Sequence, residues 1–484
     1  MKPSRMTLPL LVSIGLLTAT SAQSQFDVLE TYSSGVVVAP SGDAYLIGAA
    51  SGAYVQRLAV ATGGRCEIVS DLDTGTGLPM GSPAKGALEA GGTLVVSASS
   101  SDAVFRVDPV TGNRTVVSGL GVGLGTALDF PYPITVEASG DILVADNSNR
   151  IFRIDPASGD RTVLSSTSVG TGPDFITPRG LAVEASGDIL VANFNGDSIF
   201  RVDPATGDRT VVSDAVTGAG DEFGGPWGVA VAANGDILIA DAGGTSVLRV
   251  DPVSGDRTLI SGPSLGSGES IDTVTDIAEL ANGQLLVSDN GTDLLVVDPV
   301  TGFRAPWDCL CGSAPLATCT EAGKASLLAS DKSEGREKLK AGLKGLVDET
   351  TLVGFGDPVT GNTEVAVCVY SDESAVASML VDVPGGDCDG KPCWKAKSTK
   401  GFGFASKSTV DGVSKLGYGS GAPGKGKVTV GAAANGSQGL ARGIAGALSG
   451  SLPTVQVVTS DGFCAVATMT EAKKDDGILF KGKK

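Results

Sequence analysis

Histidine is absent from all 484 residues of the chain. A histidine-based catalytic triad, a histidine-metal cluster and a histidine general base are therefore excluded. Aromatic residues are also scarce, at 5%, whereas glycine occurs 69 times. Because apolar residues still make up 42% of the chain, this much glycine indicates many tight turns in a folded protein rather than disorder.

Long hydrophobic runs are missing too. The most apolar run, residues 8–17, is too short to cross a bilayer. It follows Lys2 and Arg5 and precedes small residues, so residues 1–22 have the pattern of a secretory signal peptide. The sequence therefore predicts a secreted or periplasmic protein without an integral membrane segment.

The eight cysteines show no CxxC spacing, which favours disulfides in an oxidising compartment over a metal or redox site. Cys388 and Cys393 bracket the turn DGKP, so we expect them to be bridged. Cys368 and Cys464 lie in strand-like runs and form a second expected pair. Cys66 is then expected to pair with one of three others: Cys309, Cys311 or Cys319.

The net charge of −18 is unevenly spread. Residues 309–484 carry 20 basic and 18 acidic residues, which gives about +2. The remainder carries 16 basic and 36 acidic residues, or −20. This negative charge argues against nucleic acid as a partner. We interpret it as a contribution to the solubility of the protein.

Residues 177–214 contain the unit from which most of the chain is built. Four strand-like runs, at 180–184, 188–193, 198–203 and 208–213, are separated by Gly, Asn, Asp and Pro turns. The second run is apolar at almost every position, which is typical of a strand buried on both faces. One four-stranded sheet cannot cover both faces, so the unit must stack on copies of itself.

The copies recur with a period of 47 or 48 residues, measured between the prolines of a VDPxTG-like turn: Pro109, Pro156, Pro204, Pro252 and Pro299. A degenerate copy at residues 58–66 makes six units. Four strands per unit at this period predict a six-bladed β-propeller over residues 26–308. Residues 26–31 form a further expected strand, which either pairs with the last blade or precedes the first.

After the repeats, residues 309–323 form a cysteine-bearing linker and residues 324–484 have a different composition, with lysine replacing arginine. Ten strand-like runs in this region predict a β-sandwich-like domain. Its lysine-rich strands are interpreted as a solvated face. The whole chain is thus expected to be all-β.

The motif P-x-G-[LV]-A-V-x-A-x-G-D-I-L-[VI]-A-[DN], followed by the VDPxTG turn, occurs at residues 178–193 and 226–241. It resembles the NHL-repeat and senescence-marker/gluconolactonase-like six-bladed propellers, a fold that hosts both enzymes and binding modules. The segments AVCVYSD, GGDCDGKPCWK and KGFGFASKS resemble an uncharacterised module of secreted bacterial repeat proteins, which suggests no activity.

The lactonase resemblance implies an axial divalent metal held by acidic or amide side chains just before the residue that opens each innermost strand. None of the six matching residues is of that kind: Ser34, Lys85, Tyr132, Arg179, Trp227 and Thr275. Asp276, one position later, is the only nearby acid in register. Virginiamycin-lyase-like propellers need a catalytic histidine, which is absent. We therefore predict no metal, no cofactor and no catalytic residue.

The connections between blades are long, whereas the turns within blades are short. The same six residues, which we call the ring residues, are expected to point into the axial channel at the rim that carries the long loops. Lys85, Tyr132, Arg179, Trp227, Thr275 and Asp276 are the candidate ligand-binding residues, because cations and aromatic rings grip anionic or sugar-like ligands. The alternative is that they only plug the channel. The predicted function is a non-catalytic binding or scaffolding module for a protein, glycan or small anionic ligand; the alternative is a degenerate metal-dependent hydrolase of the gluconolactonase type.

Two sets of polar residues are assigned lesser roles. The loop acids are expected to be solvated, with calcium binding or acid–base chemistry as the alternative: Asp129, Asp174, Asp221, Glu222 and Asp272. The residues after each second strand are expected to bond nearby backbone amides: Asp146, Asn193, Asp241 and Asp289.

Overall fold

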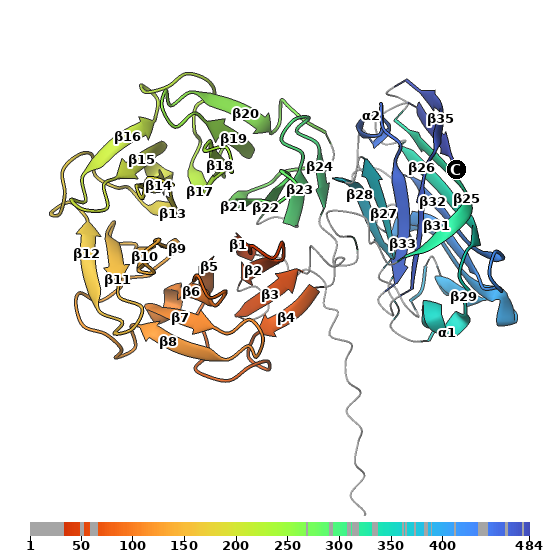
Figure 1. The fold of residues 1–484 in the computed structure, drawn as a ribbon, viewed down its shortest axis with the longest axis horizontal. Coiled ribbons are helices and arrows are strands. Elements are labelled where there is room, and N and C mark those ends of the chain that lie inside the picture. The colour runs from red at the N-terminus through yellow and green to blue at the C-terminus, as the bar shows by residue number, and fades with distance from the viewer. Residues whose placement is uncertain are drawn as a thin grey trace, which may run out of the picture.

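Six four-stranded antiparallel sheets surround one axis in the computed structural model, and a second, sheet-rich region follows them (Figure 1). This confirms the predicted all-β class and the six blades. The structure describes residues 33–48, 53–58, 66–267, 270–289, 294–306, 311, 319–331, 337–360, 363, 365–371, 374–381, 386–388, 390–410, 413–433, 444–459, 463–476 and 479–484.

Each blade takes four strands that are consecutive in sequence, ordered from the axis outwards. The first three blades are β1 (Ser33–Val38), β2 (Ala44–Gly48), β3 (Tyr54–Leu58), β4 (Cys66–Ser70); β5 (Pro83–Leu88), β6 (Leu94–Ala98), β7 (Ala103–Val107), β8 (Arg114–Ser118); β9 (Ile134–Val136), β10 (Ile142–Ala145), β11 (Ile151–Ile154), β12 (Arg161–Ser165). The last three are β13 (Pro178–Val183), β14 (Ile189–Asn193), β15 (Ser198–Val202), β16 (Arg209–Ser213); β17 (Pro226–Val231), β18 (Ile237–Asp241), β19 (Ser246–Val250), β20 (Arg257–Ser261); β21 (Val274–Glu279), β22 (Leu285–Asp289), β23 (Leu294–Val297), β24 (Arg304–Pro306).

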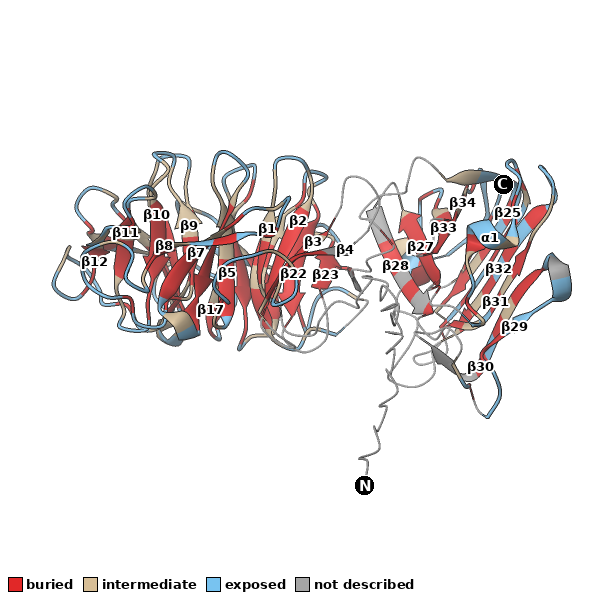
Figure 2. Ribbon diagram, turned by 90° about the horizontal axis from the view of Figure 1, so that it is seen from below, coloured by how far each residue is buried: buried red, intermediate tan, exposed pale blue. Residues whose placement is uncertain are grey.

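The second strand of each blade is the buried element around which the blades stack. Every residue of β14 is buried, and Figure 2 shows the same buried positions running through successive blades. Leu190 and Ile199 of the fourth blade share one apolar cluster with Ile237 and Leu248 of the fifth. Stacking thus covers both faces of each sheet, as the continuous apolar runs predicted.

The first and sixth blades meet to complete the ring. Val36 and Leu46 pack in one apolar cluster with Leu286 and Val296. The Val36 N–H also donates to Asp276 Oδ2 at 2.9 Å. Since β1–β4 and β21–β24 each form a complete sheet, the two ends of the repeat region meet face to face. The strand expected at residues 26–31 lies outside the described residues.

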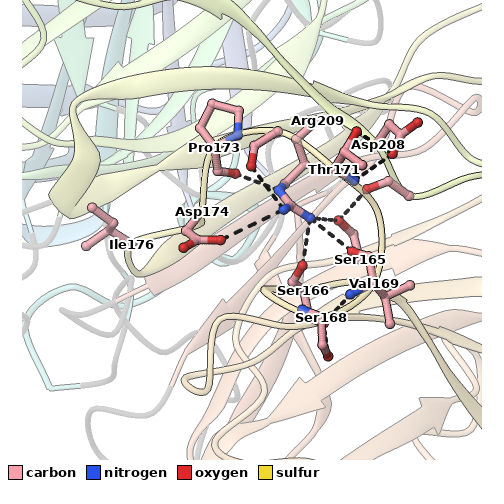
Figure 3. Close-up of polar contacts among 12 residues, drawn as sticks. Ser165, Ser166, Ser168, Val169, Thr171, Pro173, Asp174, Ile176, Asp208 and Arg209 are labelled. Carbon is pink, nitrogen blue, oxygen red and sulfur yellow. Dashed lines mark hydrogen bonds and ion pairs between the residues drawn. The ribbon is translucent and has the colours of Figure 1, made fainter.

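An arginine ties each long inter-blade loop to the following blade, as Figure 3 shows for Arg209. Arg209 donates through Nη1 to Ser165 Oγ and the Ser166 carbonyl, both at 2.8 Å, and through Nε to the Pro173 carbonyl at 2.6 Å. Ser165 Oγ in turn donates to the Gly207 carbonyl at 2.7 Å. We call this set the arginine clasp. Four other blade pairs repeat its Nη1–Oγ bond: Arg114–Ser70, Arg161–Ser118, Arg257–Ser213 and Arg304–Ser261.

The C-terminal region is one twelve-stranded sheet that curls over a shared core, in the order β28-β27-β33-β34-β25-β26-β32-β31-β30-β29 with the β35–β36 hairpin on β25. Val367, Leu343 and Val430 come from its two halves and pack in one cluster, so the region is sandwich-like as predicted. Its strands are β25 (Thr320–Ser330), β26 (Lys338–Leu346), β27 (Val365–Ser371), β28 (Ser374–Val381), β29 (Trp394–Ala396), β30 (Gly401–Val410), β31 (Val413–Gly419), β32 (Gly426–Ala433), β33 (Thr454–Thr459), β34 (Cys464–Thr468), β35 (Glu471–Asp475) and β36 (Leu479–Lys483), with short helices α1 (Leu352–Phe355) and α2 (Ile444–Ala447).

Three disulfides lie in the described residues. The predicted Cys388–Cys393 bridge is confirmed. The Cys368–Cys464 pairing was wrong: Cys368 bonds Cys311 and Cys464 bonds Cys319. The reason is topological, because β33 lies between β27 and β34, which carry the two cysteines.

Two of the three expected partners of Cys66 are thereby excluded. Cys311 and Cys319 bond elsewhere, and Cys309 lies outside the described residues.

Among the helices of the described residues, none is long and apolar enough to cross a membrane.

Candidate functional site

The innermost strands of all six blades enclose a cavity of about 370 Å³ on the propeller axis. Most of the residues that line it have apolar side chains, such as Val36, Ile134, Leu181 and Ile277, and their backbone groups make the wall polar in part. Lys85 and Asp276 are the charged residues among its lining. Because it includes the later residues of β1, β5 and β9, the cavity extends from the level of the ring residues toward the tight-turn rim.

A local break in strand pairing places most ring residues. In five blades the pairing of the innermost strand shifts register at its first residues, between Ser33 and Gly35, Pro83 and Gly86, Pro178 and Gly180, Pro226 and Gly228, and Val274 and Asp276. The skipped residues include Ser34, Lys85, Arg179, Trp227 and Thr275. Bulges of this kind re-aim a side chain, which explains how one sequence position serves the axis in successive blades.

The glycine after the bulge allows neighbouring innermost strands to approach closely. A Cβ on Gly228 would lie 2.7 Å from Asp276 Cα, and one on Gly180 would lie 2.6 Å from the Trp227 carbonyl oxygen. Real side chains cannot occupy such space without displacing the next strand. These glycines therefore keep the ring narrow and bring side chains of different blades together.

Lys85 and Asp276 form a buried ion pair across the axis. Lys85 Nζ lies 2.6 Å from Asp276 Oδ1 and also donates to the Thr275 carbonyl at 2.6 Å. Burial lowers the pKa of Lys85, Asp276 opposes this decrease, and the nearby Arg179 adds to it. Both Asp276 oxygens are engaged, since Oδ2 accepts the Val36 N–H.

Arg179 forms cation–π contacts with two aromatic rings. Its guanidinium carbon lies 4.6 Å from the centre of the Tyr132 ring and 5.5 Å from that of Trp227. The two rings meet edge to face at 5.9 Å, and Phe194 supports Trp227 at 4.9 Å. Burial is also the main cause that raises the pKa of Tyr132, so the phenol stays neutral at ordinary pH. We call Arg179, Tyr132 and Trp227 the arginine–aromatic cluster.

The charge of Arg179 has no counter-ion within the described residues, where no carboxylate lies within 4 Å of its nitrogens. Its Nε is buried without a hydrogen-bond partner, and burial lowers the pKa of the guanidinium, which nevertheless stays charged. Because Lys85 and Asp276 neutralise each other, the site carries a net charge of about +1. Burying an unpaired charge is costly.

The two remaining ring residues, Thr275 and Ser34, use their hydroxyls in hydrogen bonds within the protein. The Thr275 hydroxyl shares a hydrogen bond with Ser288 Oγ at 3.0 Å, and its carbonyl accepts from Lys85 Nζ at the axis. Ser34 donates to the Ala84 carbonyl. The structure thus brings Lys85 to Asp276 and Arg179 to its two aromatic rings, while the Thr275 and Ser34 hydroxyls bond the Ser288 hydroxyl and the Ala84 carbonyl. Whether these groups bind a ligand stays a prediction.

The loop acids lie on the surface. Asp129, Asp174, Asp221, Glu222 and Asp272 are all exposed. Within the described parts of the chain, no three His, Cys, Asp or Glu side chains gather as metal ligands would. The predicted absence of a metal remains untested.

The residues after the second strands were expected to cap tight turns by bonding nearby backbone amides; three of them bond backbone amides, but on the long loops. Asn193 accepts from Ile176 N at 2.5 Å, Asp241 from Gly224 N at 3.0 Å, and Asp289 from Asp272 N at 2.8 Å. Their partners lie on the long loops, so these side chains fasten the loops to the blade. Sequence reasoning missed the arginine clasp, although its arginine follows each VDPxTG-like turn and was visible as part of the repeat.

Residues 223–249 match the NHL repeat family model, and no curated protein matches the sequence significantly. One of the six blades thus contains a segment that matches an NHL repeat. Similar solved structures include virginiamycin B lyase from Staphylococcus aureus, with 16% identity, a TM-score of 0.41, and coverage of 58% of this chain and 85% of the lyase. A gluconolactonase from Xanthomonas campestris is 17% identical, with a TM-score of 0.37, over 54% of this chain and 84% of that protein. The calcium-binding protein regucalcin from Agrobacterium tumefaciens is 19% identical, with a TM-score of 0.39, over 53% and 82%.

Proposed function

We propose that this protein is an exported, non-catalytic binding module whose propeller takes a small carboxylate-bearing ligand at the long-loop end of its axial channel. The observation that carries the proposal is Arg179, a largely buried cation without a counter-ion, held between two aromatic rings. A ligand carboxylate would pair with the guanidinium and neutralise its charge. Tyr132 and Trp227 would stack on the remainder of the ligand.

The hydrolase alternative is weaker because of how Asp276 is used. Its two oxygens bond Lys85 and the Val36 N–H, so a divalent cation would have to displace both. Lys85 would also repel such an ion at close range. Hard cations need several converging oxygen ligands, and the other ring side chains provide hydroxyls, aromatic rings and cations.

Calorimetry with acetate, succinate, citrate and gluconate as probes tests the proposal. We expect stoichiometric binding of at least one probe, and Arg179→Gln should weaken it at least about tenfold, since a lost charged hydrogen bond costs about 1.5–3 kcal/mol. Arg249→Gln is the matched control, because Arg249 lies on the blade surface with a 40% exposed side chain. Equal effects of the two variants, or no binding of any probe, would refute the proposal. Stoichiometric binding of calcium, zinc or manganese that Asp276→Ala abolishes would support the hydrolase instead.

A further inference from the structure

Among the described residues, one face of the C-terminal sheet carries lysine as its only charged side chain on β26, β29, β31 and β32. Side chains alternate between the two faces of a strand. On β26, Lys338, Lys340 and Lys344 are exposed, while Leu339 and Leu343 lie in the core. The same alternation on neighbouring strands defines what we call the lysine face: Lys324, Lys338, Lys340, Lys344, Lys395, Lys397, Lys415 and Lys427.

The centre of the lysine face is a row of like charges. Lys344 of β26 lies directly opposite Lys324 of β25 on one side and Lys427 of β32 on the other. No carboxylate among the described residues forms an ion pair with any of these three. Like charges directly opposite each other destabilise a sheet. The charges of this row therefore do not stabilise the fold, although the Lys427 stem lies over Gly419. A function outside the fold would account for the charges.

Solubility alone does not explain the row, because other exposed strands of this chain carry both acidic and basic residues. On the adjoining hairpin, Glu471 of β35 lies opposite Lys483 and pairs with it at 2.9 Å. Lysines that only prevent aggregation are typical of edge strands. Lys344 and Lys427 instead lie on strands paired on both sides.

Small residues fill the space between the lysines. Gly342, Thr429, Gly417 and Gly403 follow one another across β26, β32, β31 and β30 at directly paired positions. A Cβ on Gly431, in the next row, would meet only Lys415 Cβ, at 3.9 Å. Glycine inside a strand often marks a place where a ligand approaches the backbone. Around Gly431 the surface is therefore low, whereas the Lys397 side chain lies over Gly403 and near Gly417.

The face lacks the groups that other polyanion partners would use. The aromatic residues of these strands, Trp394, Phe402, Phe404 and Tyr418, are all buried in the core. Single-stranded nucleic acid binds on exposed aromatic platforms, and a membrane surface takes exposed apolar side chains into its interface. Neither is present among the described side chains of this face, so repeated negative charge with hydroxyls is the chemistry left.

We propose that the lysine face is a docking surface for an extended acidic polysaccharide. Its sugar carboxylates would pair with rows of lysines, and its hydroxyls would bond Ser326, Thr429 and the backbone at the glycines. The face belongs to β25, β26 and β29–β32, whereas β28 and β27 lie nearest the propeller (Figure 1). It is therefore accessible in the intact chain and independent of the axial channel.

The test uses the full chain and polygalacturonate of defined length, with neutral dextran as the control polymer. We expect binding to polygalacturonate at low salt that weakens as salt increases, and no binding to dextran. The double variant Lys344→Gln/Lys427→Gln should weaken binding about tenfold, from about 0.7 kcal/mol for each exposed charge pair. The control Lys391→Gln/Lys473→Gln removes the same charge from exposed lysines outside the lysine face and should change the affinity less than about twofold.

Thermal unfolding checks that the variants fold, and removing the like-charge row should leave the melting temperature unchanged or raise it. Failure of polygalacturonate to bind would overturn the proposal. So would equal weakening by both double variants, because it would indicate attraction by net charge alone. Tighter binding to single-stranded DNA or to phosphatidylserine vesicles would also overturn it, in favour of those partners.

Discussion

Asp241 provides the sharpest test of how the blades are held together. It is fully buried at the end of β18, where both oxygens lie 3.0 Å from a single donor, the Gly224 N–H. Burial is the main cause that raises its pKa from 3.8 to about 6, with a further contribution from Asp197. One hydrogen bond does not compensate for burying the charge, so the ionised carboxylate costs stability at neutral pH.

The fourth blade shows what replaces this carboxylate without cost. Asn193 occupies the equivalent position, accepts the Ile176 N–H through Oδ1 and donates through Nδ2 to Ser198 Oγ at 3.0 Å. Asp241 pairs in register with Ser246, as Asn193 pairs with Ser198. An asparagine at position 241 therefore has an acceptor ready for its new N–H.

We predict that Asp241→Asn stabilises the propeller at pH 7. A pKa that is raised in the folded state means that the folded protein binds the proton more tightly than the unfolded chain. The wild-type contribution is therefore most favourable below about pH 4 and is lost as pH rises through about 6. A shift of about two pKa units corresponds to about 3 kcal/mol, or a melting temperature higher by about 5 °C for a domain of this size.

Scanning calorimetry of the propeller transition at pH 4 to 8 is the measurement. The difference between variant and wild type should be small at pH 4 and reach its full value above pH 6. Asp289→Asn is the control, because Asp289 accepts two backbone N–H groups, one on each oxygen; an amide can accept only one of them, so this variant should be destabilised. If Asp241→Asn destabilises the protein at pH 7, or stabilises it equally at all pH values, the reasoning about the buried charge is wrong.

Three further predictions concern the scaffold. Arg209→Met should cost about 3 kcal/mol in urea unfolding, because it leaves buried carbonyls without donors, whereas Arg249→Met should cost less than about 1 kcal/mol; equal costs would refute the clasp. Gly207→Ala places a Cβ 2.0 Å from the Leu164 carbonyl at φ +75° and should abolish or severely lower expression of folded protein, whereas Gly187→Ala, at φ +94° in open space, should cost only about 1 kcal/mol. Replacing Cys319 and Cys464 by alanine, which are 145 residues apart, should cost about 5 kcal/mol, against about 2 kcal/mol for the Cys388 and Cys393 pair; thermal unfolding would contradict this if the order were reversed.

The blades could be predicted because their information is local and repeated. A strand such as β14, apolar at successive positions, has only one way to be buried, and tight turns recur at fixed distances from it. The ring position could be placed for the same reason, because the glycine after Arg179 and Trp227 marks where neighbouring strands approach. What these side chains contact was beyond the sequence, since the Lys85–Asp276 pair joins residues 191 positions apart.

Two features of the C-terminal region show why the rest was not predictable. The expected Cys368–Cys464 pair failed because strand order, unlike strand existence, depends on long-range pairing. β35 was missed because all five of its residues are exposed, so it has no apolar alternation to mark it. Its pairing depends on β36, whose Phe480 is buried in the core.

The propeller repeats the same residues where successive blades pack against each other, but it has different residues where the blades meet the axis. The clasp arginine, its serine and the turn glycine recur from blade to blade, because each blade faces the same packing problem. The ring position instead reads Ser34, Lys85, Tyr132, Arg179, Trp227 and Thr275, six different side chains on one pseudo-symmetric scaffold. A plug would need only volume, which repeated apolar residues supply at lower cost. One unpaired cation between two aromatic rings, beside a neutral ion pair, is a directional arrangement that suits an asymmetric anionic ligand.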